Sequence, residues 1–147
     1  QERFIELIVK KMYGTISSKK IAILGFSFKA NTNDTRESPA IYICKKLIEE
    51  GAYLKIYDPK VNNEQISMDL SESKTTKWIS CQTAYDALED TDAGVFLTEW
   101  SEFEFLDWER ISSMMIKPAW IFDTRLIVNI RKVKDSGLNI WQVGYGN

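Results

Sequence analysis

The stretch that decides the fold is IAILGFSFKANTNDTRESP, residues 21–39. Its first four residues are apolar, which is typical of a buried strand, and Ser38 followed by Pro39 is typical of a helix N-cap with proline at the first helical position. The segment between them is therefore a loop from a strand to a helix. In open α/β sheets such loops lie at the carboxyl ends of the strands, where ligands bind. Lys29 and Arg36 bring two positive charges to this loop, so we expect an anionic ligand.

Strand and helix patterns alternate on both sides of this loop. Strands are predicted near residues 54–57, 78–81, 94–98, 120–123 and 139–143, helices at 1–13, 39–50, 83–89 and 107–115, and a polar, irregular excursion over most of 60–80. Alternating strands and helices favour a parallel sheet covered on both faces. The predicted fold class is therefore α/β, a Rossmann-like three-layer sandwich with a mostly parallel sheet of about five or six strands.

Length and composition are those of one domain with an adequate core. A chain of this size buries roughly 68–70% of its unfolded surface. The net charge of −2 argues against nucleic acid or an anionic membrane as a partner. No apolar run approaches the ~18 residues that span a bilayer, and no secretory leader is visible. We expect a cytoplasmic protein.

The counts of histidine and cysteine exclude several kinds of site. The chain has no histidine, which rules out a Ser-His or Cys-His catalytic pair and a His-ligated metal within it. Cys44 and Cys81 lie far apart without a CxxC pattern, so we expect reduced thiols, with Cys44 packed in the core. No metal site is predicted.

The order of glycine, helix, second strand and then Asp58 is the order of an NAD-binding unit. However, the loop lacks GxGxxG, because Gly25 is followed by side chains that would obstruct close approach of the backbone to a pyrophosphate. Asp58 also lies well beyond the usual ~20 residues after the glycine. We therefore expect no complete dinucleotide site within this chain.

Four motifs resemble, in order, those of one enzyme family. They are Gly25-Phe26-Ser27-Phe28-Lys29 with Asn31-Thr32 and Asp34-Thr35-Arg36-Glu37-Ser38-Pro39, then Ile56-Tyr57-Asp58-Pro59-Lys60-Val61, Thr98-Glu99-Trp100, and Ile121-Phe122-Asp123-Thr124-Arg125. Over about residues 15–145, the chain resembles the C-terminal, UDP-binding domain of UDP-glucose 6-dehydrogenases, a branch of the nucleotide-sugar dehydrogenase family.

The resemblance implies that Phe28, Lys29 and Arg125 contact the UDP-sugar and that Arg36 contacts NAD. These residue types suit the task, since a guanidinium gives paired hydrogen bonds to phosphate, a lysine gives a point charge and an aromatic ring gives uracil a flat apolar surface. The alternatives are core packing for Phe28, idle surface charges for Lys29 and Arg125, and pairing of Arg36 with a neighbouring acid. Thr124 stands where the family has a small residue, and a turn that needed glycine geometry there would displace Arg125.

The resemblance also implies an organisation larger than this chain. Residues 1–17 correspond to the end of a helix connecting to a central region, and residues 18–147 to the UDP-binding domain. The catalytic cysteine and lysine of the family belong to the N-terminal and central regions, so no catalytic residue is predicted here. NAD is bound mainly by the N-terminal domain. The implied partners are UDP-glucose or UDP and those other domains, in a homo-oligomer.

The implied reaction is the oxidation of UDP-glucose to UDP-glucuronate in two NAD-dependent hydride transfers, and we expect the isolated chain to be inactive. Two alternatives stay open at this point. The substrate is another nucleotide sugar, such as UDP-N-acetylmannosamine or GDP-mannose, or the chain is a non-catalytic nucleotide-binding module. A GxGxxG unit and a cysteine motif upstream of Gln1 would identify a dehydrogenase.

Overall fold

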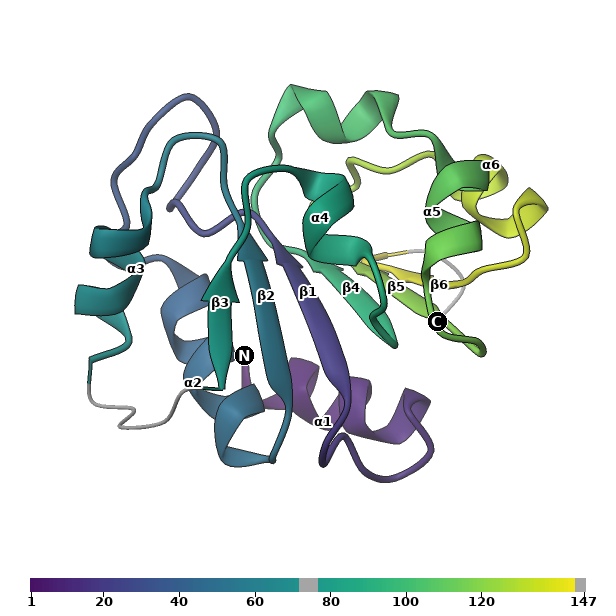
Figure 1. Cartoon of the computed structure of the whole chain (residues 1–147), viewed down its shortest axis with the longest axis horizontal. Helices are drawn as coiled ribbons and strands as arrows, with labels where there is room; N and C mark the ends of the chain where they lie inside the picture. The colour runs from purple at the N-terminus through teal and green to yellow at the C-terminus, as the bar shows by residue number, and fades with distance from the viewer. Residues whose placement is uncertain (72–76, 145–147) are drawn as a thin grey trace.

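The computed structural model of the chain describes residues 1–71 and 77–144. In chain order its elements are α1 (Glu2–Lys11), β1 (Lys20–Leu24), α2 (Pro39–Glu49), β2 (Tyr53–Tyr57), α3 (Asn63–Asp69), β3 (Trp78–Ser80), α4 (Ala84–Leu88), β4 (Ala93–Phe96), η1 (Ser101–Phe105), α5 (Trp108–Met114), β5 (Trp120–Asp123), α6 (Ile130–Asp135) and β6 (Asn139–Gln142). Figure 1 shows one twisted sheet between two layers of helices. Among the described residues, no helix combines the length and the apolar composition needed to cross a membrane.

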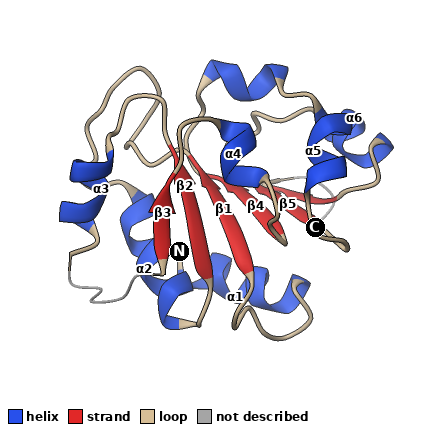
Figure 2. Cartoon of the chain, viewed as in Figure 1, coloured by secondary structure: helices blue, strands red, loops and turns tan. Residues whose placement is uncertain are grey.

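The six strands form one sheet in the order β3-β2-β1-β4-β5-β6, and every neighbouring pair is parallel. The chain runs outward from β1 in one direction through β2 and β3, then returns to the other side of β1 and continues through β4, β5 and β6. The direction reverses between β1 and β4, which is the position where open α/β sheets bind ligands. The predicted α/β, Rossmann-like fold is confirmed (Figure 2).

Each face of the sheet has its own hydrophobic core, because successive strand residues point to opposite faces. On β1, Ile21 and Ile23 join one core with α1, α2 and α3, whereas Ala22 and Leu24 join the other with α4, α5 and α6. Helix α1 is part of the first core, since its apolar stripe buries Ile5 and Ile8 there.

Cys44, a residue of α2, is completely buried in the core that α1 and α2 share, and burial raises the pKa of its thiol. The prediction that this cysteine serves packing is confirmed. Cys81 is a half-buried free thiol, and burial raises its pKa as well.

Two short helices lie where the sequence analysis predicted none. The prediction of an irregular excursion over residues 60–80 was wrong where α3 forms, with the Asn62 side chain accepting a hydrogen bond from the Gln65 amide at 2.9 Å and Ile66 buried. Asn129 caps α6 in the same way. Helices this short draw their stability from packing and capping rather than from propensity, so apolar periodicity is a weak signal for them. The predicted strand at β3 is confirmed.

Candidate functional site

The loop after β1 begins at a glycine that the packing requires. Gly25 has φ of 100°, and a Cβ there would lie 2.5 Å from the Cβ and the Oγ1 of Thr98, which follows β4. Only a residue without a side chain adopts this backbone and allows this approach without strain. The ends of β1 and β4 are thereby held together at the position where the strand order reverses.

The next two residues, Phe26 and Ser27, have every backbone polar group bonded to a side chain from another segment. The Asp58 carboxylate accepts from the amides of Phe26 at 2.7 Å and of Ser27 at 2.9 Å. Ser38 Oγ donates to the Phe26 carbonyl at 2.8 Å, and Thr98 Oγ1 donates to the Ser27 carbonyl at 2.9 Å. Buried backbone groups need such partners, and here the partners also fix the path of the loop.

Phe28 and Lys29 follow this fixed dipeptide and extend into solvent. Phe28 is 44% exposed, so the alternative that its side chain packs in the core is wrong. Lys29 is exposed, and among residues 1–71 and 77–144 no carboxylate lies within ion-pair distance of its ammonium group. Phe28 and Lys29 thus place an exposed ring and an exposed cation on the loop at the carboxyl edge of the sheet.

Arg125, which follows β5, reaches the same place. Its Nε donates to the Leu97 carbonyl at 3.0 Å, and its Nη2 donates to the Phe28 carbonyl at 3.3 Å. Nε also lies 3.6 Å from Glu99 Oε1, and the arginine side chain remains 34% exposed. The structure thus brings together the three residues predicted to contact the UDP-sugar. We call the patch formed by Phe28, Lys29 and Arg125 the loop surface.

The buried carboxylate of Asp123 shapes the turn that carries Arg125. It accepts hydrogen bonds from the backbone amides of Arg125, Ile127 and Val128 and from the side-chain amide of Gln142, at 2.8–3.0 Å. These four donors bond both carboxylate oxygens, so Asp123 orients neighbouring groups.

Thr124 does not displace Arg125. Its hydroxyl donates to the Phe96 carbonyl at 2.8 Å, which anchors the start of the turn to β4. The left-handed residue of the turn is Leu126, with φ of 59°, so the position occupied by the β-branched residue needs no glycine geometry.

Arg36 lies apart from these contacts, on the outer part of the loop. Its Nε and Nη2 donate to the two carboxylate oxygens of Asp34 at 3.0 and 2.9 Å, and its side chain is 88% exposed. The guanidinium holds the pKa of Asp34 at about 2, well below its ordinary value. The structure therefore pairs Arg36 with the neighbouring acid, one of the alternatives left open, while leaving it accessible to a ligand held by another part of the protein.

Three residues that organise the loop surface were missed as site residues. Asp58, Thr98 and Glu99 each contact the loop or Arg125. Their common signal is their position just past the carboxyl ends of β2 and β4, where parallel strands deliver side chains to one edge.

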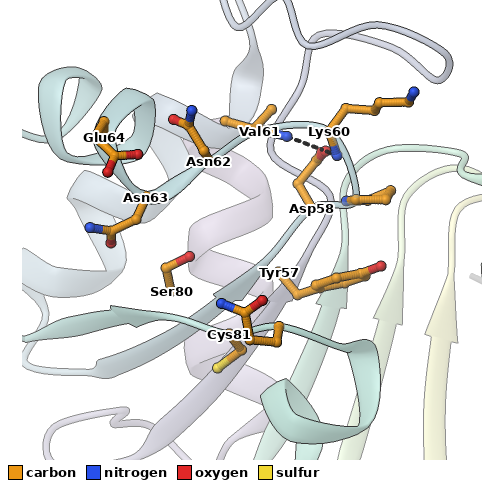
Figure 3. A pocket seen from close by; sticks show the side chains of 11 residues that line it. Tyr57, Asp58, Lys60, Val61, Asn62, Asn63, Glu64, Ser80 and Cys81 are labelled. Atoms are coloured by element: carbon orange, nitrogen blue, oxygen red, sulfur yellow. Dashed lines mark hydrogen bonds between the residues drawn. The ribbon is translucent and has the colours of Figure 1, made fainter.

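A separate cavity of about 470 Å³ lies at the ends of β2 and β3. In Figure 3, Asn63 and Glu64 at the start of α3 lie across this cavity from Ser80 and Cys81. Lys60 also lines it, but none of the predicted site residues does. We call it the β2–β3 hollow.

Comparison with known proteins gives consistent matches. The model of the UDP-glucose/GDP-mannose dehydrogenase family, UDP binding domain, matches residues 22–130. The chain is 44% identical to UDP-glucose 6-dehydrogenase 4 of Arabidopsis thaliana, over 98% of the chain and 33% of that protein. It is 45% identical to UDP-glucose 6-dehydrogenase of Drosophila melanogaster, over 98% of the chain and 32% of that protein.

Among solved structures, the NDP-N-acetyl-D-galactosaminuronic acid dehydrogenase of Methanosarcina mazei Go1 shares the fold, with a TM-score of 0.78 and 18% identity over 97% of this chain and 28% of that one. The chain thus spans about a third of the length of the relatives it matches.

Proposed function

This chain belongs to the UDP-glucose/GDP-mannose dehydrogenase family as a UDP binding domain, and from that we propose that it holds the UDP part of UDP-glucose in an NAD-dependent UDP-glucose 6-dehydrogenase. The observation that carries the proposal is the 3.3 Å contact between Arg125 Nη2 and the Phe28 carbonyl. This contact brings residues almost a hundred positions apart in sequence to one patch beside the strand-order reversal.

Each residue of the loop surface has a proposed role. Lys29 supplies a mobile ammonium to the diphosphate, and Arg125 offers it the guanidinium donors that its backbone contacts leave free. The exposed ring of Phe28 gives uracil a flat apolar face. We expect the hydride-transfer chemistry to belong to other parts of the protein, as the family resemblance implies.

The choice of UDP-glucose rests on the relatives. Those that match at 44–45% identity are UDP-glucose 6-dehydrogenases. On these matches we take UDP-glucose as the substrate, in preference to UDP-N-acetylmannosamine, GDP-mannose or a non-catalytic nucleotide-binding role.

The proposal extends to the rest of the protein. NAD is held mainly by another domain, and Arg36 contacts it from this one, which its exposed guanidinium allows. Residues 1–17 form the end of a connecting helix and residues 18–147 the UDP-binding domain, within a homo-oligomer. The helix α1 packs against this domain, because Ile5 and Ile8 are buried in the core of the sheet.

The proposal is tested by titrating the chain with UDP, UMP, uridine and NAD and measuring heat of binding. We expect UDP to bind weakly, since other parts of the enzyme share the pocket, and UMP and uridine to bind progressively more weakly because they lose phosphate contacts. NAD should not bind, and the chain alone should not reduce it in the presence of UDP-glucose. Uridine binding as tightly as UDP would contradict the role given to Lys29 and Arg125.

A further inference from the structure

The most heavily hydrogen-bonded side chain at the carboxyl edge is a buried acid with no role in the function proposed above. Asp58 is 7% exposed, and no cation lies within ion-pair distance of it among the residues that the structure describes. Oδ2 accepts from the amides of Phe26 and Ser27 and from Trp100 Nε1, and Oδ1 accepts from the amides of Lys60 and Val61, all at 2.7–3.1 Å. A buried carboxylate needs this many donors when it has no counter-ion.

The position of Asp58 in the fold shows which ligand contacts these hydrogen bonds replace. β1 and β2 are parallel neighbours that end in register at Leu24 and Tyr57, so Asp58 stands beside the start of the loop. In a dinucleotide-binding Rossmann unit, the loop amides face a pyrophosphate and an acid after the second strand accepts from the ribose. Here the acid accepts from the loop amides themselves. The loop amides and the acid, which would each bond to a dinucleotide, are bonded to each other here. Neither is free to bind a dinucleotide.

The same bonds decide where the loop surface lies. The Asp58 carboxylate fixes the amides of Phe26 and Ser27, and Phe28 and Lys29 are the next two residues along the chain. The Phe28 amide is in turn bonded to the Asp34 carbonyl at 2.7 Å, which closes the loop behind them. Rotation of the first two peptides would carry the ring and the ammonium with it.

We propose that Asp58 is the positioning residue of the loop surface, an internal anion that replaces a bound phosphate at the loop amides and so fixes Phe28 and Lys29 for UDP. The part of this inference that concerns UDP rests on the function proposed above. The part that concerns the loop does not, and the two are measured separately.

The first measurement needs no variant. In the ¹⁵N,¹³C-labelled chain, the amide nitrogens of Phe26 and Ser27 should show through-hydrogen-bond scalar couplings to the side-chain carboxyl carbon of Asp58, and both amides should exchange slowly with solvent. Absence of the couplings together with fast exchange of both amides would overturn the proposal, whatever the variants do.

The second measurement uses Asp58→Ala and Asp58→Asn. Leaving buried donors without an acceptor costs on the order of 1–3 kcal/mol, so we expect amide exchange at Phe26 and Ser27 to accelerate about fivefold to a hundredfold and the Trp100 indole N–H resonance to shift. Asp58→Asn keeps the shape but turns one acceptor into a donor, and should show the same effects. Asp107→Ala is the control, because it removes a carboxylate that caps α5 and accepts from the Arg110 amide, outside this loop. It should leave the amides and the indole signal unchanged.

The third measurement adds formate to Asp58→Ala. Formate supplies the missing carboxylate, so tens of millimolar should restore slow exchange, the Trp100 signal and the UDP affinity, which we expect to fall about tenfold in the variant. Unchanged UDP affinity in a variant with a loosened loop would overturn the positioning role. If the unmodified chain binds no UDP, the proposed function fails, yet the couplings and the formate rescue still decide whether Asp58 holds the loop.

Discussion

The carboxyl edge of the sheet carries two surfaces of opposite character. The β2–β3 hollow has a volume of about 470 Å³, and its lining includes both Lys60 and Glu64, whose charges oppose each other. The loop surface carries Lys29 and Arg125, with the Glu99 carboxylate 3.6 Å from Arg125, and its backbone is tied to the ends of β2, β4 and β5. A diphosphate needs positive charge on a fixed backbone, so we propose that UDP binds the loop surface rather than the hollow.

Asp58 lies between the two surfaces and explains the contrast. Its side chain lines the β2–β3 hollow, but its oxygens accept from the loop and from Trp100. The Asp58 carboxylate is thus bonded to the loop backbone rather than free in the β2–β3 hollow, and these bonds fix the loop.

The largest effect should come from removing Arg125. In the longer protein, Arg125→Ala should raise the KM for UDP-glucose with little change in the KM for NAD, because losing one partner of a buried charge pair costs about 2–5 kcal/mol, or roughly 30-fold to several-thousand-fold. Arg125→Lys should recover only part of the loss, since lysine lacks the planar fork.

Arg36→Ala is the matched control for Arg125. It should leave the KM for UDP-glucose within about twofold and raise the KM for NAD, since its guanidinium faces solvent beyond the loop surface. Parallel shifts of both KM values in both variants would show that these arginines serve domain closure or folding rather than separate ligands.

A smaller effect should separate the two surfaces directly. Lys29→Ala should weaken UDP binding to the chain about tenfold to a hundredfold, because a hydrogen bond to a charged group contributes about 1.5–3 kcal/mol. Lys60→Ala removes the side chain that lines the β2–β3 hollow but keeps the backbone amide bonded to Asp58. It should change UDP affinity less than twofold, and the reverse ranking would place the ligand in the hollow.

The smallest effect concerns the outer part of the loop. The side-chain hydrogen bonds from Arg36 lower the pKa of Asp34 from 3.8 to about 2. A lowered folded-state pKa means that the pair stabilises the loop above about pH 4 and that this contribution is lost as the pH falls through about 2. Following the Asp34 carboxyl carbon by NMR should give a midpoint near 2 in the unmodified chain and a higher midpoint in Arg36→Ala, which keeps only the hydrogen bond from the backbone amide of residue 36. Equal midpoints would show that the pair does not persist in solution.

Much of the fold could be predicted because single residues mark where helices begin. The Ser38 cap is formed as predicted, with Ser38 Oγ accepting from the Ala40 amide, and Asp107 caps α5. The helices α3 and α6 were not predicted, because each buries a single residue of its own, which forms no periodic pattern, whereas the shorter α4 buries three.

The candidate site was predictable only in part. Phe28, Lys29 and Arg125 stand in motifs, and the parallel order of β1, β4 and β5 brings them together. Asp58 was judged only as a possible ribose acid, because its use as an acceptor for loop amides depends on the register of β1 and β2, which sequence spacing does not reveal. The doubt raised by Thr124 likewise depended on which turn residue is left-handed, and that residue is Leu126.

The most direct test of the account is to map UDP onto the chain by amide chemical shifts. The account predicts that UDP moves the signals of residues 27–30 and 124–127, and that residues 60–64 and 80–82 around the β2–β3 hollow stay within the shifts caused by buffer alone. Shifts concentrated at residues 60–64 and 80–82, with the Phe28, Lys29 and Arg125 amides unmoved, would contradict it.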